Sequence, residues 1–119
     1  MIEDLSVQER IARYLKNRPH QKIAKGEIAD IAREKMGVTG ETVGRRLRVL
    51  HEASSMTIDE CPTDEHIKAL SLLEGGIVDV EYREKQHAWY WYEPPKVRKV
   101  RKVRIVGMTA YEYYETVTT

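Results

Sequence analysis

Three arginines and two threonines occur at helical spacing in residues 39–53, and they are the side chains in this sequence best suited to bind an anion or a base edge. Val43, Leu47 and Leu50 recur at intervals that place them on one face of a helix. Arginine can pair with guanine or clamp phosphates, threonine can contact a phosphate or a thymine methyl group, and glutamate can accept a hydrogen bond from cytosine. The candidate contact residues of this helix are Thr39, Glu41, Thr42, Arg45, Arg46 and Arg48. We therefore predict a helix with one apolar face towards the core and an opposite face that binds nucleic acid.

Two further helical patterns precede this segment. Residues 6–18 and 25–36 are predicted helices, and the first has Ser6 and Glu9 at the spacing of a capping box. Gly37 fits a left-handed position at the end of the second helix. The break before Thr39, an N-cap residue by type, is short, which is the layout of a helix-turn-helix.

An additional helix is predicted at about residues 63–74, capped by Thr63 and ended by two glycines. Its exposed side is acidic, and Lys68 is its only basic residue. Because phosphates would repel such a surface, we reject it as the helix that contacts DNA. It could pack as a fourth core helix or form a dimer surface.

Residues 77–82 and 88–92 read as the two strands of a hairpin, the second rich in aromatic residues that favour strands. A two-residue turn would place Tyr82 opposite Trp89, whereas a three-residue loop would place it opposite Ala88, and the sequence does not choose between them. Both tryptophans of the second strand are predicted to lie in the core. The tip could contact the DNA backbone or minor groove, or be a plain surface turn; its candidate contact residues are Arg83, Lys85, Gln86 and His87.

The C-terminal part of the sequence is basic and rich in tyrosine. Residues 96–106 contain six basic residues and no acidic ones. The valine and isoleucine content favours a strand over an extended arm, and Gly107 with Met108 has the form of a tight hairpin turn. We predict a hairpin of 98–106 with 109–117, with a helix over the second segment as the alternative.

This register would set three cations opposite tyrosines, which suits cation–aromatic contacts: Arg104 opposite Tyr111, Lys102 opposite Tyr113, and Arg101 opposite Tyr114. The basic segment could grip phosphates, which would make binding sensitive to salt, or it could be an edge strand that charge protects from aggregation. The candidate contact residues here are Lys99, Arg101, Lys102 and Arg104.

The runs 25–29, 40–53 and 73–82 together resemble the winged helix-turn-helix DNA-binding superfamily, whose members include small prokaryotic, archaeal and viral transcriptional regulators. The resemblance covers about residues 6–93. It implies an α+β fold with a three-helix core and a β-hairpin wing. The extra helix within 54–75 departs from the usual pattern, in which the arginine-bearing helix leads almost directly into the wing. We expect a winged-helix domain in 1–95 and a basic, tyrosine-rich β extension in 96–119.

Composition excludes several classes of function. No stretch of the 119 residues has the apolar length that crosses a membrane, and no secretory signal pattern opens the sequence. The lone Cys61 fits a reducing compartment, and with His66 it is the only close pair of soft metal ligands. We therefore expect a cytoplasmic, nucleoid-associated protein without metal or cofactor, and no enzyme, because no acid–base constellation is present.

The sequence thus predicts sequence-specific binding to double-stranded DNA, with a role in transcription regulation. Helix 39–53 would enter the major groove, with the wing and the basic tail on the backbone. A homodimer is expected, through the acidic helix or the tyrosine-rich C-terminus, because two half-sites double the discrimination. The alternative is a winged-helix protein-interaction module in a larger assembly. DNA binding would require the helix, wing tip and tail on one positive surface.

Overall fold

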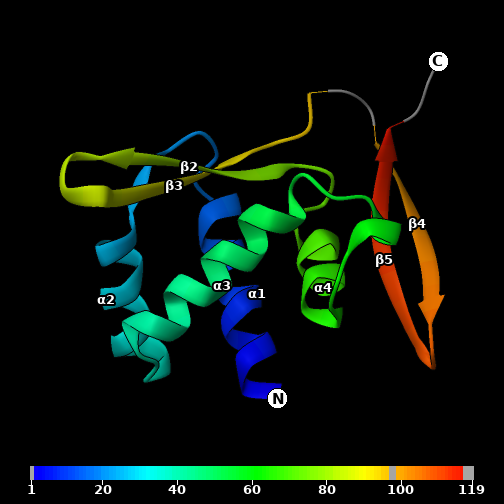
Figure 1. Ribbon diagram of the computed structural model, residues 1–119, viewed down its shortest axis with the longest axis horizontal. Coiled ribbons are helices and arrows are strands. Elements are labelled where there is room, and N and C mark those ends of the chain that lie inside the picture. Colours follow the sequence, from blue (N-terminus) through cyan, green and yellow to red (C-terminus); the bar gives the residue numbers. More distant parts are fainter. Residues whose placement is uncertain (1, 97–98, 117–119) are drawn as a thin grey trace.

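Helices form most of the first two thirds of the chain and antiparallel strands form the last third (Figure 1). The computed structural model describes residues 2–96 and 99–116, and the side chains of all these residues except 2–6, 86 and 116. Within them the fold is α+β, with four α-helices and two small antiparallel sheets. The helices are α1 (Ile2–Lys16), α2 (Lys25–Met36), α3 (Gly40–Ala53) and α4 (Asp64–Leu72), and the 3-10 turns are η1 (Ile58–Glu60) and η2 (Glu84–Gln86). The strands are β1 (Ile23–Ala24), β2 (Ile77–Arg83), β3 (His87–Glu93), β4 (Lys99–Val106) and β5 (Thr109–Thr116).

The first two helices differ in how well the sequence predicted them. α1 starts at Ile2, so Ser6 lies inside the helix and the predicted capping box with Glu9 is wrong, because an N-cap residue has to precede its helix. α2 has the predicted bounds. It ends at Gly37, which adopts φ 66° and donates its N–H to the Arg33 carbonyl oxygen at 3.1 Å.

α3 is capped and oriented as its sequence predicts. The Thr39 hydroxyl accepts a hydrogen bond from the Thr42 N–H at 3.3 Å, which satisfies one of the free donors of the first turn. Val43, Leu47 and Leu50 are completely buried on one face of the helix. That face packs against α1, α2, α4 and β2, so α3 is the central helix of the molecule.

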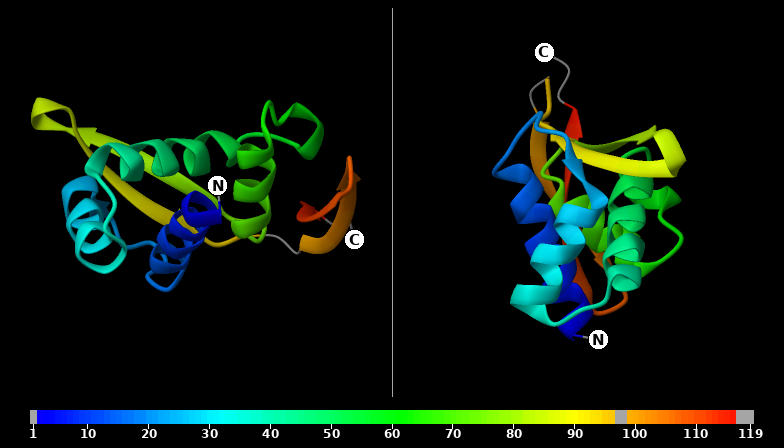
Figure 2. Two further views of the ribbon diagram at one scale, coloured as in Figure 1. Left: turned by 90° about the horizontal axis from the view of Figure 1, so that it is seen from below. Right: turned by 90° about the vertical axis from the view of Figure 1, so that its left-hand side faces the viewer.

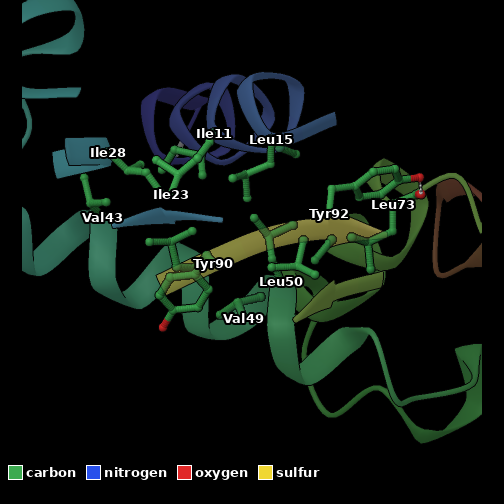
Figure 3. Packing of buried hydrophobic residues seen from close by; sticks show 14 of the residues in the cluster. Ile11, Leu15, Ile23, Ile28, Val43, Val49, Leu50, Leu73, Tyr90 and Tyr92 are labelled. Carbon is green, nitrogen blue, oxygen red and sulfur yellow. Dashed lines mark hydrogen bonds between the residues drawn. The ribbon is translucent and has the colours of Figure 1, made fainter. Parts of the chain in front are cut away.

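The hydrophobic core lies between the helices and the inner face of the first sheet (Figure 3). Leu15 of α1, Leu50 of α3 and Tyr90 of β3 meet there. The Tyr92 hydroxyl donates a hydrogen bond to the Leu73 carbonyl oxygen at 2.5 Å. Burial, followed by the nearby Glu74 carboxylate, raises the pKa of Tyr92 to about 12.

The first sheet has the order β1-β3-β2, and its register decides which aromatic residues are buried. Tyr82 pairs with Ala88, so the tip is a three-residue loop. Because side chains alternate along a strand, this register turns Tyr90 and Tyr92 towards the core. Trp89 and Trp91 lie on the other face and are half-buried, so the prediction that they lie in the core is wrong.

α4 separates α3 from the second sheet, which is the hairpin of β4 and β5 (Figure 1). The Thr63 hydroxyl caps α4 by accepting from the His66 N–H at 3.2 Å, as predicted. Tyr111 of β5 is buried, while most of β4 is exposed.

The register of the β4–β5 hairpin is the predicted one, with Arg104 opposite Tyr111, Lys102 opposite Tyr113, and Arg101 opposite Tyr114. The strand over Thr109–Thr116 rules out the helical alternative, while the predicted end positions 98 and 117 lie outside the described residues. Gly107 has φ 63° and opens the two-residue turn.

The molecule is elongated, measuring 41 × 32 × 22 Å, and its two hairpins lie at opposite ends of the longest axis (Figure 1). The tip between β2 and β3 points to one end, and β4 with β5 forms the other. Figure 2 (left) shows α3 on one side of the molecule and α1 with α2 on the opposite side.

Candidate nucleic-acid interface

The outward side of α3 carries the side chains that the sequence singled out, with one exception. Arg45 and Arg48 are exposed, and so is Glu41 in the first turn. Thr39 is exposed and Thr42 is half-buried, and their hydroxyls lie 3.2 Å apart. Two arginines, one glutamate and one threonine are therefore accessible along this side of the helix, with Thr42 partly so.

Arg46 is the exception, and its predicted place on the exposed face is wrong. The side chain is 1% exposed and lies beneath α4 and α1. Its guanidinium donates to the Gln8 side-chain oxygen at 3.5 Å and to the Glu65 carboxylate at 3.4 Å, and its Nε has no partner among the described residues. Arg46 thus connects three helices and offers no surface to an external ligand.

Lys25, which the sequence analysis did not single out as a contact residue, extends the exposed face of α3. A Cβ atom placed on Gly44 would lie 2.9 Å from Lys25 Nζ, so the ammonium group of the first residue of α2 lies directly over α3. The absence of a side chain at Gly44 makes room for it. Lys25 also lines a hollow with His87 and Trp89, which brings α2 next to the β2–β3 hairpin. The position of Lys25 at the start of a predicted helix was visible in the sequence, but no sequence pattern indicated that Lys25 would contact α3.

The junction between α3 and the β2–β3 hairpin is formed by an arginine and two tyrosines. Burial raises the pKa of Tyr90, the neighbouring Tyr82 adds to this effect, and the positive charge of Arg48 opposes it. The charge of Arg48 thus acts on Tyr90, and Tyr82, which is 66% exposed, lies beside Tyr90. α3 contacts the hairpin through β2.

The hairpin itself holds Arg83 in a fixed orientation. The Arg83 guanidinium lies 4.1 Å from the centre of the Trp89 ring, and its Nε donates to the Glu81 carboxylate at 2.7 Å. The second Glu81 oxygen accepts from Lys22 Nζ at 2.9 Å, and Lys22 in turn lies 4.8 Å from the Trp91 ring centre. The hydrogen bonds from Arg83 and then Lys22 lower the pKa of Glu81.

At the tip, Lys85 adopts φ 58°, and its side chain is exposed, as is that of His87. The side chain of Gln86, the remaining predicted contact residue of the tip, lies outside the described side chains. Five exposed cations at the start of α2, on α3 and on this hairpin are grouped under one name, the cationic surface: Lys25, Arg45, Arg48, Arg83 and Lys85.

The basic residues of β4 lie elsewhere and are already paired. Lys102 pairs with Glu115 at 3.4 Å, and Arg104 pairs with Asp59 of η1. Arg101 likewise pairs with Glu112 at 3.5 Å, so in the described structure these cations bind carboxylates instead of stacking on the tyrosines opposite them.

The remaining predicted contact, Lys99, is half-buried, and a Cβ on Gly75 would lie 2.8 Å from its Cγ. Because the two hairpins are at opposite ends of the molecule (Figure 1), the tail does not extend the cationic surface.

The remaining reactive side chains do not form a second site in the described part of the chain. Burial, followed by the charge of Glu60, raises the pKa of Cys61 and disfavours its thiolate. His66 lies between the Thr63 hydroxyl at 2.6 Å and the Glu52 carboxylate at 3.0 Å. No three His, Cys, Asp or Glu side chains among the described residues gather as metal ligands would. None of the described helices has the length and apolar character needed to cross a bilayer.

No protein-family model, curated protein or solved structure matches this chain, so its function has to be inferred from its own residues and geometry.

Proposed function

We propose that this protein is a winged helix-turn-helix protein that binds double-stranded DNA in a sequence-dependent manner and acts in transcription regulation. The order α1-β1-α2-α3, followed after η1 and the inserted α4 by β2 and β3, supports this architecture, and β1 joins the sheet of the wing formed by β2 and β3. So does the connection of only three residues between α2 and α3. α3 takes the role of the recognition helix.

The observation that carries the proposal is that the five cations come from the start of α2, from α3 and from the wing. These three elements are separate in the sequence and contact one another in the fold. Duplex DNA carries one negative charge per about 1.7 Å of its axis, so a surface with five accessible cations has a natural complement in it. The same elements carry acidic residues: Glu41 and Glu84 are exposed, and Glu81 is half-buried and pairs with Arg83.

Within this proposal the residues divide by chemistry. Arg45 and Arg48, at the exposed centre of α3, would read base edges or clamp phosphates. Lys25, Arg83 and Lys85, at the margins, would position the protein on phosphates, which carry no sequence information. The cations of β4 lie at the other end of the molecule, so the expectation that helix, wing tip and tail share one positive surface is wrong for the tail. We therefore assign the tail no essential contact.

A homodimer remains part of the proposal, and the β4–β5 hairpin is the surface that best fits it. Val103 and Ile105 of β4 are 61% and 71% exposed, and Met108 at the turn is completely exposed. Apolar residues so exposed on an edge strand are typical of protein contacts. The same observation favours a second candidate function, a winged-helix interaction module within a larger assembly.

The test is binding to random-sequence duplex DNA, measured by fluorescence anisotropy at about 50 and 200 mM salt. The double variant Arg45→Ala/Arg48→Ala should lose at least about tenfold in affinity and reduce the slope of log affinity against log salt by about two. The matched control, Arg33→Ala/Arg101→Ala, removes two exposed arginines outside the cationic surface and should bind within about twofold of the unmodified protein.

Failure of the folded protein to bind at 50 mM salt would reject DNA binding and favour the interaction module. Selection of preferred duplexes from the random pool would then decide whether the binding depends on sequence. Light scattering of the unmodified protein beside Ile105→Glu tests the dimer, because a charge in the exposed apolar cluster should yield monomers.

A further inference from the structure

A groove of about 340 Å³ opens between α1 and α2, away from the cationic surface. α1 and α2 lie on the side of the molecule opposite α3 (Figure 2, left). The volume falls within the range of small-molecule sites in proteins. Its lining comes from residues 10–18, in the second half of α1 and the turn that follows it, and from residues 28–36 of α2.

The floor and walls of the groove are apolar. Ile11, Ile28 and Ala32 are buried and belong to the core, so the floor is rigid. Ile31 and Met36 form walls that are half-buried and would lose further contact with water if the groove were filled. Covering apolar surface of this kind favours a complex because it removes that surface from water.

The polar residues around this floor are cationic, apart from Asn17 and the Tyr14 hydroxyl, and no carboxylate lines the groove. Arg18 lies 3.8 Å from the centre of the Tyr14 ring and donates to the Tyr14 carbonyl oxygen at 3.1 Å, so it is held at the wall. Arg13 pairs with Glu9 at 3.0 Å. Arg10 and Lys35 have no ion pair with any described residue. The groove therefore complements a ligand with an apolar body and an anionic group.

We propose that the groove between α1 and α2 binds an apolar carboxylate of the size of a medium-chain fatty acid, with Arg10 and Lys35 holding the carboxylate. The lining runs from Arg10 to Arg18, which is about 12 Å along the helix axis and matches an extended chain of about ten carbons. A single acyl chain therefore fits the length, the apolar floor and the positive charge of the groove.

The experiment titrates the full chain with decanoate, below its micelle concentration, and follows backbone amide chemical shifts. Decanoate should bind saturably and shift amides of α1 and α2. Decyltrimethylammonium, which has the same chain and the opposite charge, should bind at least about tenfold more weakly. The variant Arg10→Gln/Lys35→Gln should weaken decanoate binding about tenfold, because it removes two exposed charge pairs that each contribute only a small part of the affinity. The control Arg33→Gln removes a cation of α2 outside the groove and should leave binding unchanged.

Three results would overturn the proposal: equal binding of the two probes, shifts centred outside α1 and α2, or unaltered affinity in the double variant with its fold verified by thermal melting. Shifts at the same residues with an acidic amphipathic peptide but none with decanoate would also overturn it, and would identify the groove as a protein contact. DNA binding by the cationic surface is a separate measurement, so either proposal can fail alone.

Discussion

Replacing Arg46 with methionine should leave the protein as stable as before or make it more stable, although it removes a buried charge and two hydrogen bonds. The guanidinium is 1% exposed, its two partners lie at the long distances of 3.4 and 3.5 Å, and its Nε has no partner in the described structure. Such weak compensation barely offsets the cost of removing an arginine from water. Replacing a whole buried ion pair by apolar side chains is typically neutral or stabilising by about 1–4 kcal/mol. Here only the arginine is replaced, but the carboxylate left behind, Glu65, is 46% exposed and can be hydrated.

Replacing the carboxylate of the same pair should instead lower the stability of the fold. Glu65→Gln removes the carboxylate that pairs with Arg46 among the described side chains and leaves the buried charge uncompensated. Such a loss costs about 3–5 kcal/mol for a fully buried pair, but the Glu65 side chain is 46% exposed, so we expect about 1–2 kcal/mol after screening by water. In the Arg46→Met background the same Glu65→Gln change should leave stability almost unaltered, because the buried charge that Glu65 compensates is already gone.

Urea and thermal unfolding followed by circular dichroism measure these differences, and about 1 kcal/mol corresponds to roughly 4 °C in Tm for a chain of this size. DNA binding of Arg46→Met should equal that of the unmodified protein. The reasoning fails if Arg46→Met destabilises the fold by more than about 2 kcal/mol, because the pair would then be a net stabilising contact. It also fails if the stability is kept but DNA affinity is lost, since Arg46 would then reach the ligand.

Three further outcomes are expected. The folded-state pKa of Tyr92 is about 12, above its usual value of about 10, so the contribution of Tyr92 to stability is complete below pH 10 and declines as pH rises towards 12. In Tyr92→Phe, the free energy of unfolding in urea should therefore change less between pH 9 and 11 than in the unmodified protein. The variant should also lose about 1 kcal/mol at pH 7, because the hydrogen bond to Leu73 is removed. Gly76→Ala should lower Tm by more than about 8 °C, because its Cβ would lie 2.5 Å from the Glu93 carbonyl oxygen. Thr39→Ala should cost about 1 kcal/mol of unfolding free energy through the lost N-cap.

Features that depend on a few neighbouring residues were predictable from the sequence. Thr39 caps its helix and Gly37 ends the preceding one because side-chain type and backbone freedom decide these positions locally. The register of β4 with β5 follows from the two-residue turn at Gly107, so it too could be read from the sequence. The turn between β2 and β3 lacks such a residue. The sequence therefore could not predict the register of these two strands, on which the burial of Tyr90 in place of Trp89 depends.

The burial of Arg46 could have been partly foreseen. At 100° per residue it lies only about 60° from Val43 around the helix, close to the apolar face, whereas Arg45 and Arg48 lie much farther round. A charged side chain at such a border usually turns outwards to water. It is covered here because α4, inserted after α3, packs over that side. The decisive contact therefore comes from a segment 19 residues away along the chain, which helical periodicity does not reveal.

The position of the β4–β5 hairpin is the feature with the largest consequence for function, and no local pattern determines it. Its strands and turn are encoded within residues 99–116, but its place is set by the packing of Tyr111 near α4 and by the ion pair of Arg104 with Asp59. These contacts hold the most basic stretch of the sequence at the far end of the molecule from the wing. A run of charge in a sequence predicts the presence of a cationic strand but not the surface that it joins. The proposed DNA surface consequently rests on α2, α3 and the wing, and the exposed Val103 and Ile105 make the hairpin better suited to contact protein.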